Sequence, residues 1–130
     1  MSKKFQGRVI AKGNLTGSAV VSKDLLNLMA IVDNAVIQHD VKGNILCLPK
    51  AGFTKFGGMF LLTACKKGFA PSAMLFSETV DEESASAIVA ASNWLGYSLI
   101  AIDRLGNEFL DMVKNDTKIE IKDTGEVTIL

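Results

Sequence analysis

Three short, uninterrupted apolar runs constrain the fold of this 130-residue chain more than any other feature. They are Asn44 to Pro49 (NILCLP), Pro71 to Ser77 (PSAMLFS) and Tyr97 to Ile102 (YSLIAI). Strands that are apolar at consecutive positions, and not only at alternate ones, are typical of parallel strands covered on both faces. Parallel neighbours need crossover connections, which are usually helices. We therefore expect one α/β domain over residues 1–130, with a central, partly parallel sheet and crossover helices.

The segment after each apolar run has helical features. Phe56, Phe60 and Thr63 lie at helical spacing after the first run, and Gly68 follows two lysines as a helix stop. After the second run, Thr79 or Asp81 can cap a helix that has acidic residues in its first turn and ends at Gly96. A short amphipathic helix over Asn107 to Lys114 follows the third run.

Both ends of the chain have strand patterns. Phe5 to Ala11 and Ser18 to Ser22 predict two N-terminal strands joined by a turn, and Thr117 to Ile121 with Val127 to Leu130 predicts a hairpin. We expect these terminal hairpins to form a second, antiparallel layer on the central sheet. Between Lys23 and Asp40 the pattern fits a short helix or an irregular apolar loop, followed by a strand.

Charge and composition exclude several classes of function. Fourteen Lys and Arg residues balance fourteen Asp and Glu residues, so the basic excess of a nucleic-acid-binding protein is missing. The N-terminus lacks the apolar run of a signal peptide, and no segment approaches the length of a membrane span, so we expect a soluble, cytoplasmic protein with no membrane contact. Cys47 and Cys65 lie in apolar runs, outside any CxxC motif. We expect buried reduced thiols and no zinc or iron–sulfur site built from this chain alone.

Ligands of open α/β sheets bind beyond the carboxyl ends of the strands, so the loops after Pro49, Ser77 and Ile102 are the candidate places for function. The first of these loops reads Lys-Ala-Gly-Phe-Thr-Lys over residues 50–55. Its free backbone N–H groups, together with Lys50 or Lys55, suit the carboxylate or phosphate of an acidic metabolite. The alternative is that Thr54 only caps the following helix and both lysines are solvated.

Three further features each have a functional and a structural interpretation. Gly57 and Gly58 either let a ligand or another chain approach closely or form a loosely wound first helical turn. The pair Asp103 and Arg104 either contributes to a site or forms a local ion pair in a turn. His39 is the single histidine and has no evident Ser or Asp companion, which favours a surface or packing role over that of a catalytic base.

A resemblance covers the chain nearly end to end. The segments that carry it are GRVIAKG at Gly7, GSAVVS at Gly17, VKGNILCLP at Val41, GGMFLLTACKKGFAPSAMLF from Gly57, SAIVAASNWLGYSLIAID from Ser86 and DTKIEIKDTGEVTI from Asp116. In order and character they resemble the small subunit, or swivel domain, of the aconitase X family. The resemblance implies the swivelling β/β/α fold, in agreement with the element order predicted above.

The resemblance also implies an activity and a partner. The family dehydrates small hydroxy acids, either cis-3-hydroxy-L-proline or mevalonate 5-phosphate, and we expect the proline derivative as substrate first. An iron or iron–sulfur centre and most catalytic groups belong to a large subunit, so this chain would hold no cofactor and would be the small subunit of a heteromer. Apolar residues near the loop, Phe53, Phe56, Met59 and Phe60, would contribute to that interface.

The chain departs from the family in the loop after the central strand, and its segment between Val21 and Val41 is shorter than the family's usual one. The family pattern after the central strand is Gly-Ser-Ser-Ser-Gly-Ser, and its leading serine is the group expected to abstract a proton. Here Thr54 takes that place, and the resemblance implies that Gly52, Phe53, Lys55, Gly57 and Gly58 bind the substrate around it. Thr is stiffer and bulkier than Ser, so the resemblance allows a preserved reaction on an altered substrate or a lost site.

Two alternatives to an active subunit therefore stand. One is a non-catalytic paralogue that still binds a large subunit. The other is a phosphohistidine carrier domain of similar architecture, which needs a histidine beside a Gly-rich turn at a helix start, a setting that His39 lacks.

Overall fold

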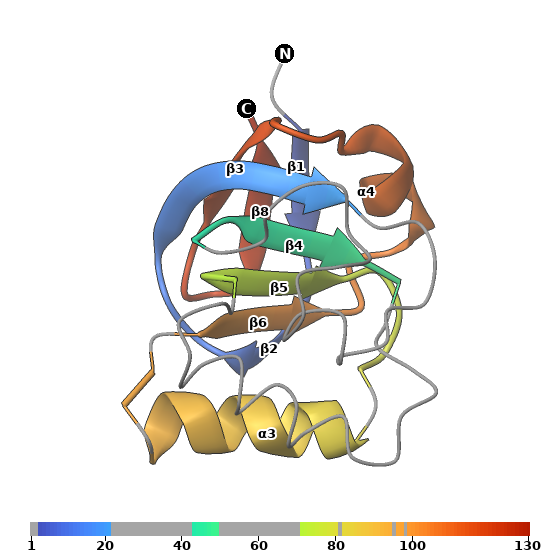
Figure 1. Cartoon of the computed structure of the whole chain (residues 1–130). Helices are drawn as coiled ribbons and strands as arrows, with labels where there is room; N and C mark the ends of the chain where they lie inside the picture. Colours follow the sequence, from blue (N-terminus) through green and yellow to red (C-terminus); the bar gives the residue numbers. More distant parts are fainter. Residues whose placement is uncertain (1–2, 22–42, 50–70, 81, 95, 98) are drawn as a thin grey trace.

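The computed structural model describes residues 3–21, 43–49, 71–80, 82–94, 96–97 and 99–130. Strands and helices in these ranges are shown in Figure 1. The strands are β1 (Lys3–Gln6), β2 (Arg8–Ala11), β3 (Leu15–Val21), β4 (Ile45–Leu48), β5 (Ala73–Phe76), β6 (Ile100–Asp103), β7 (Lys118–Ile121) and β8 (Glu126–Ile129), and the helices are α3 (Glu82–Asn93) and α4 (Asn107–Met112).

The described strands form one sheet in the order β1-β8-β7-β3-β4-β5-β6-β2. Strands β3 to β6 are parallel neighbours, and the remaining pairs are antiparallel. Strand β3 belongs to both layers, because Leu15–Ser18 pairs with β7 and Ala19–Val21 pairs with β4. The end strands β1 and β2 are separated only by Gly7, so the sheet curls until it nearly closes (Figure 1). The α/β class, the partly parallel sheet and the second β layer are thus confirmed.

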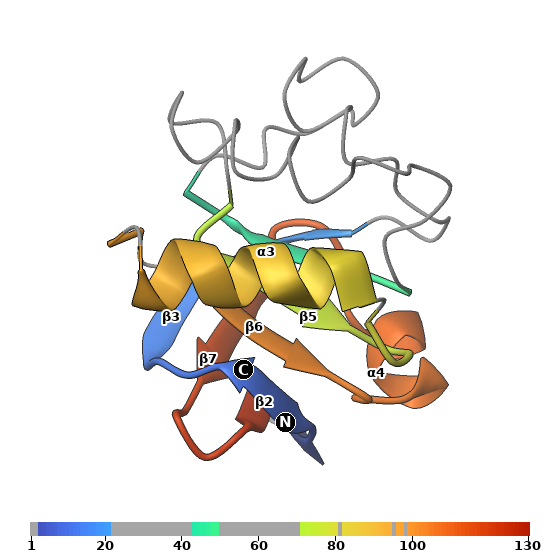
Figure 2. The ribbon, with the colours of Figure 1, turned by 90° about the horizontal axis from the view of Figure 1, so that it is seen from below.

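The three apolar runs are the buried centre of this sheet. Every residue of β4, β5 and β6 is buried, which confirms that these strands are covered on both faces. Alternate side chains enter two different cores: Leu46 and Met74 pack with Ile88 of α3, whereas Cys47 and Leu75 pack with residues of α4 and the second layer. Figure 2 shows α3 running alongside the parallel strands. The buried thiol of Cys47 agrees with the prediction, and Cys65 lies outside the described residues.

The N-terminal hairpin was a wrong prediction. The predicted strand over Phe5 to Ala11 is divided at Gly7, and its halves pair with distant strands, β1 with β8 and β2 with β6. Gly7 passes so close to β6 that an added Cβ would lie 2.4 Å from Cγ2 of Ile102 and 2.6 Å from the carbonyl oxygen of Asp103. The chain therefore crosses between the layers at the residue that has no side chain.

Other predicted elements are confirmed. Helix α3 ends near Gly96, whose φ is +77°, and the hairpin of β7 and β8 turns at Gly125, whose φ is +91°. Helix α4 is also present. The predicted helix ending at Gly68 and the segment from Lys23 to Asp40 lie outside the described residues. Among the described helices, none combines the length and hydropathy that a membrane crossing requires.

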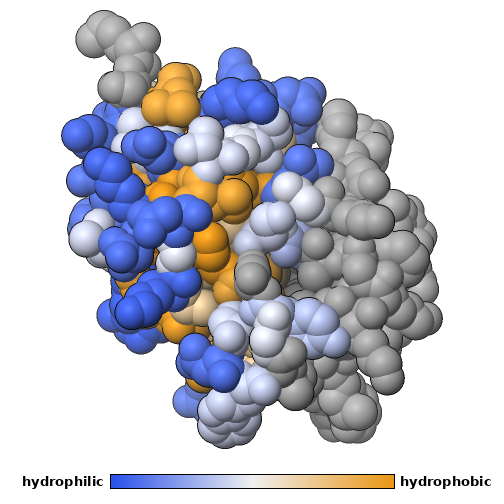
Figure 3. Space-filling view, turned by 90° about the vertical axis from the view of Figure 1, so that its left-hand side faces the viewer, coloured by the Kyte–Doolittle hydropathy of each residue, from blue (hydrophilic) through white to orange (hydrophobic). Residues whose placement is uncertain are grey.

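The side of the molecule at which β3 bends is shown in Figure 3, with hydrophobic atoms at its centre and hydrophilic atoms around them. A hollow of about 410 Å³ is lined there by residues including Leu15, Glu120 and Ile121. A second, of about 420 Å³, is lined by residues including Tyr97 and Ile100, at the start of β6. These hollows adjoin the second layer and the amino end of β6, away from the edge where α/β sheets bind ligands.

Candidate functional site at the carboxyl edge of the parallel strands

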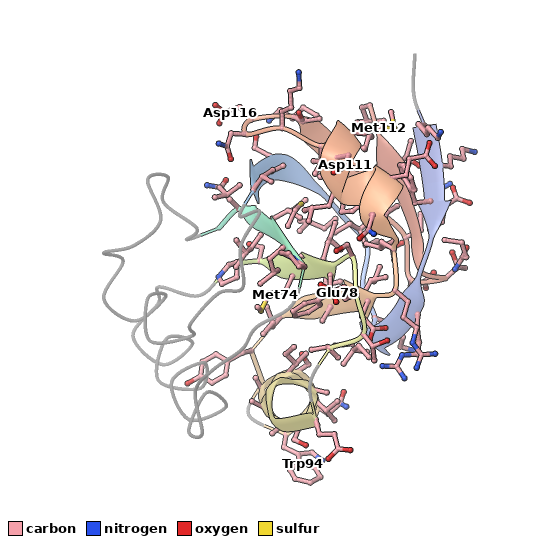
Figure 4. The ribbon with its side chains drawn as sticks, turned by 90° about the vertical axis from the view of Figure 1, so that its right-hand side faces the viewer. Met74, Glu78, Trp94, Asp111, Met112 and Asp116 are labelled. Atoms are coloured by element: carbon pink, nitrogen blue, oxygen red, sulfur yellow. The ribbon has the colours of Figure 1, made fainter. Side chains whose placement is uncertain are left out.

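The chain segments that follow the three central strands meet at one edge. The amide of Ser77 donates to the carbonyl of Leu48 (3.0 Å), and the amide of Glu78 donates to that of Pro49 (3.1 Å). The amide of Arg104 in turn donates to the carbonyl of Glu78 (3.1 Å). Figure 4 views the molecule from this edge and labels Glu78. The ends of β4, β5 and β6 are therefore locked side by side, as the sequence predicted.

Asp103 holds this edge together from inside. Its side chain is fully buried, and it accepts hydrogen bonds from Nε (2.9 Å) and Nη2 (2.7 Å) of Arg8 on β2. It also accepts a hydrogen bond of 2.9 Å from the backbone N–H of Val80, which leads into α3. The hydrogen bond to this carboxylate raises the pKa of the Arg8 guanidinium above its ordinary value. Because a buried carboxylate needs such partners, Asp103 is a structural tie between β6, β2 and α3.

The pairing of Asp103 differs from one sequence interpretation. A local ion pair between Asp103 and Arg104 was one alternative, but the ion-pair partner of Asp103 is Arg8. Arg8 lies opposite Asp103 in the antiparallel register of β2 and β6, 95 positions away in the chain. Sequence reasoning missed Arg8 because local patterns do not specify a long-range register.

Arg104 takes a different position from its neighbour. Its side chain is exposed, and its Nε donates to Oγ1 of Thr79 at 3.3 Å. Thr79 was one of two candidate caps for α3, and its described hydrogen bond is this one from Arg104. The backbone around Arg104 is fixed, because the amides of Leu105 and Gly106 donate to the carbonyls of Phe76 and Ser77. The guanidinium is therefore presented to solvent from a rigid base.

Ser77 contributes a second polar group at this edge. It is buried, and its Oγ has no hydrogen-bond partner among the residues that the structure describes. A buried hydroxyl without a partner costs free energy, so it marks a place where the core is not fully satisfied. The sequence pattern placed Ser77 at the end of a strand, but it did not show that the hydroxyl would be buried without a described hydrogen-bond partner.

An open groove of about 740 Å³ lies between β2 and α3. Its walls are mostly apolar, with Val9 and Val89 among them, and Arg8 and Glu82 add charge. Trp94 also lines the groove, is 82% exposed and projects away from the body of the molecule (Figure 4).

The predicted loop residues themselves lie outside the described residues. They are Gly52, Phe53, Thr54, Lys55, Gly57 and Gly58, and the same holds for His39 and Lys50. The last described residue before the loop is Pro49, whose carbonyl accepts the hydrogen bond from Glu78 at the carboxyl edge. The roles of the loop residues stay predictions.

Comparison with known proteins decides the family. The profile described as the aconitase X swivel domain matches residues 4–129 of the chain. The chain belongs to the aconitase X swivel domain family. The resemblance inferred from the sequence segments is therefore confirmed.

Named relatives of this swivel domain align over almost the whole chain. The phosphomevalonate dehydratase small subunit of Methanocella arvoryzae is 24% identical over 95% of this chain and 96% of its own length. That of Pyrococcus furiosus is 29% identical over 98% of this chain and 96% of its own.

Solved structures share the fold of this swivel domain. Aconitase X of Thermococcus kodakaraensis in its holo form superposes with a TM-score of 0.83 at 23% identity, covering 98% of each chain. A UPF0107 protein solved by NMR in solution gives a TM-score of 0.81 at 22% identity, covering 98% of this chain and 99% of its own.

The part of the swivel domain that the structure describes contains no group of three His, Cys, Asp or Glu residues placed to hold a metal ion. Cys47 is enclosed in β4 and Asp103 is committed to Arg8 and Val80. These residues do not fit an iron or iron–sulfur centre.

Proposed function

We propose that this chain is the small, swivelling subunit of a heteromeric dehydratase that removes water from a small hydroxy acid. One observation carries the proposal: relatives named as small subunits of such an enzyme align with the chain over 95 to 98% of its length. The large subunit would supply an iron or iron–sulfur centre and most catalytic groups. The swivel domain would close on it with the carboxyl edge of β4, β5 and β6 facing the cleft.

Dehydration of a hydroxy acid needs a base for the carbon-bound proton, help for the departing hydroxyl and a clamp for the carboxylate. We assign Thr54 to the first task, because it takes the place of the family's leading serine and keeps a hydroxyl. Gly52, Phe53, Lys55, Gly57 and Gly58 would surround the substrate. The position of Pro49 at the carboxyl edge supports this assignment, since the loop begins there.

The substrate is the finer part of the proposal. From the sequence resemblance we expected cis-3-hydroxy-L-proline first and mevalonate 5-phosphate second. The names of the relatives favour the reverse order, because the matching proteins of Methanocella arvoryzae, Archaeoglobus fulgidus and Pyrococcus furiosus are all named phosphomevalonate dehydratase small subunits. We therefore propose mevalonate 5-phosphate as the substrate to test first.

The test is an anaerobic reconstitution with the large subunit from the same genome, followed by assay of water loss from both compounds. Turnover of mevalonate 5-phosphate supports the full proposal, and turnover of the proline derivative alone overturns the substrate assignment. A stable complex that turns over neither overturns the dehydratase assignment for these substrates and favours the non-catalytic paralogue.

Thr54 is tested in the same complex. Thr54→Ala should abolish dehydration while the subunit stays folded, and Thr54→Ser, which keeps the hydroxyl, should retain it. Full activity of a stably folded Thr54→Ala complex would remove Thr54 from the mechanism.

A further inference from the structure

Arg104 has a backbone conformation that side chains rarely adopt. Its φ is +60°, and the only other described residue with a side chain in this region is Asp116, with a φ of +69°. Elsewhere in the described chain the left-handed positions are occupied by glycine, including Gly106 only two residues later. A glycine at position 104 could make the same backbone hydrogen bonds without strain. At this position arginine therefore differs from glycine in what its side chain adds, not in its backbone hydrogen bonds.

Most N–H donors of the Arg104 guanidinium make no hydrogen bond to the described residues. It presents five N–H groups, and its described hydrogen bond is the one from Nε to the neutral hydroxyl of Thr79. Asp103 is already paired with Arg8, and Glu78 forms no ion pair with Arg104 in the described part of the chain. The ion pairs described there are Lys3–Glu108, Lys4–Glu126, Arg8–Asp103 and Lys122–Glu126. Arg104 is thus an exposed cation at the carboxyl edge, and most donors of its planar fork, which matches a carboxylate or a phosphate, have no hydrogen-bond partner among the described residues.

We propose that Arg104 binds an anionic group of the substrate when the swivel domain closes on its partner. This inference rests on the proposed function and adds a substrate-binding residue outside the predicted loop. Thr79 orients the guanidinium through Nε, and the hydrogen bond from the amide of Arg104 to Glu78 fixes the point from which it projects. The bound group is a carboxylate or a phosphate, which the measurements below distinguish.

The backbone conformation gives a test that separates binding from folding. Arg104→Gly removes the guanidinium and relieves the strained φ, so the variant should melt at about 2 to 5 °C above the wild type. Asp116→Gly is the matched control, because it relieves the same strain at a residue far from Glu78 in Figure 4. In the reconstituted complex, Arg104→Gly should lower kcat/KM about tenfold to a hundredfold, mainly through KM. Asp116→Gly should leave kcat/KM unchanged, and Arg104→Lys should fall between the two.

Inhibition identifies the group that Arg104 binds. If it binds the phosphate, the inhibition constant of inorganic phosphate rises in Arg104→Gly and that of acetate does not; if it binds the carboxylate, the reverse holds. A wild-type KM and unchanged inhibition constants in Arg104→Gly would overturn the inference. A lower melting temperature for Arg104→Gly would also overturn it, since the side chain would then serve the fold.

A measurement without turnover keeps this inference separate from the proposed function. If the wild-type complex turns over neither substrate, the proposed function fails, and the complete chain is titrated with inorganic phosphate and with acetate. We expect millimolar dissociation for at least one anion with the wild type and Asp116→Gly, and at least fivefold weaker binding with Arg104→Gly, on the order of one lost contact. Equal dissociation constants for all three proteins would overturn the inference.

Discussion

Replacing Asp103 with alanine should destabilise the fold more than any other single change of a charged residue described here. The carboxylate is fully buried and accepts three hydrogen bonds, two from Arg8 and one from the amide of Val80. Without it, the buried N–H of Val80 loses its partner, which costs about 1 to 3 kcal/mol. Loss of the charge-assisted hydrogen bonds from Arg8 adds to this cost, although the half-exposed guanidinium regains hydrogen bonds to water. Together these effects give a loss of about 4 kcal/mol in the free energy of unfolding.

Urea denaturation measures this loss. With a slope of about 2 kcal/mol per molar urea, the unfolding midpoint of Asp103→Ala should fall by about 2 M at an unchanged slope. Asp103→Asn keeps an oxygen for Val80 and for Nη2 of Arg8 but turns an amide NH2 toward Nε of Arg8, so its midpoint should fall by about 1 M. A fall of less than about 0.3 M for Asp103→Ala would refute the structural role given to this carboxylate.

The matched control is an ion pair at the surface. Lys4 and Glu126 approach to 3.8 Å, with the lysine side chain 67% exposed. Exposed pairs contribute about 0 to 1 kcal/mol, so Lys4→Gln should shift the midpoint by no more than about 0.5 M.

Two further predictions concern packing at the same edge. Gly7→Ala should cost about 2 to 3 kcal/mol, because the new Cβ would meet Ile102 and the carbonyl of Asp103; Gly43→Ala, at a φ of +72° and with no described atom within 4 Å of the new Cβ, should cost only about 1 kcal/mol. Equal melting temperatures for these two variants would contradict the close crossing at Gly7. Ser77→Ala should leave the free energy of unfolding unchanged or raise it by up to about 1 kcal/mol, since the hydroxyl has no partner in the described part of the chain; a loss of more than about 1 kcal/mol in urea denaturation would show that it has one.

Much of the fold was predictable because its signals are local. The apolar runs at β4, β5 and β6 are continuous because both faces of the sheet are covered, and Gly125 marks the tight turn between β7 and β8. The N-terminal strands were mispaired because their partners, β8 and β6, lie about a hundred residues away. No local pattern encodes such a register, and the crossing at Gly7 is visible only once Ile102 is seen against it.

The location of the candidate site could be predicted from the sequence, but the contacts within it could not. The rule that ligands bind at the carboxyl ends of parallel strands located the edge where Pro49, Glu78 and Arg104 meet. It did not reveal that Asp103 is committed to Arg8, or that Arg104 has a left-handed backbone, because both depend on tertiary contacts. The assignment of Thr54 comes from the family resemblance and awaits the reconstituted complex.

We propose that this chain completes a dehydratase together with a large subunit. The most direct measurement titrates the chain into the anaerobically purified large subunit and follows water loss from mevalonate 5-phosphate. We expect little turnover without the chain and a rate that rises linearly until a fixed, integral ratio of the two subunits is reached. A rate that does not depend on the chain, or the absence of any complex between the two proteins, would contradict the account.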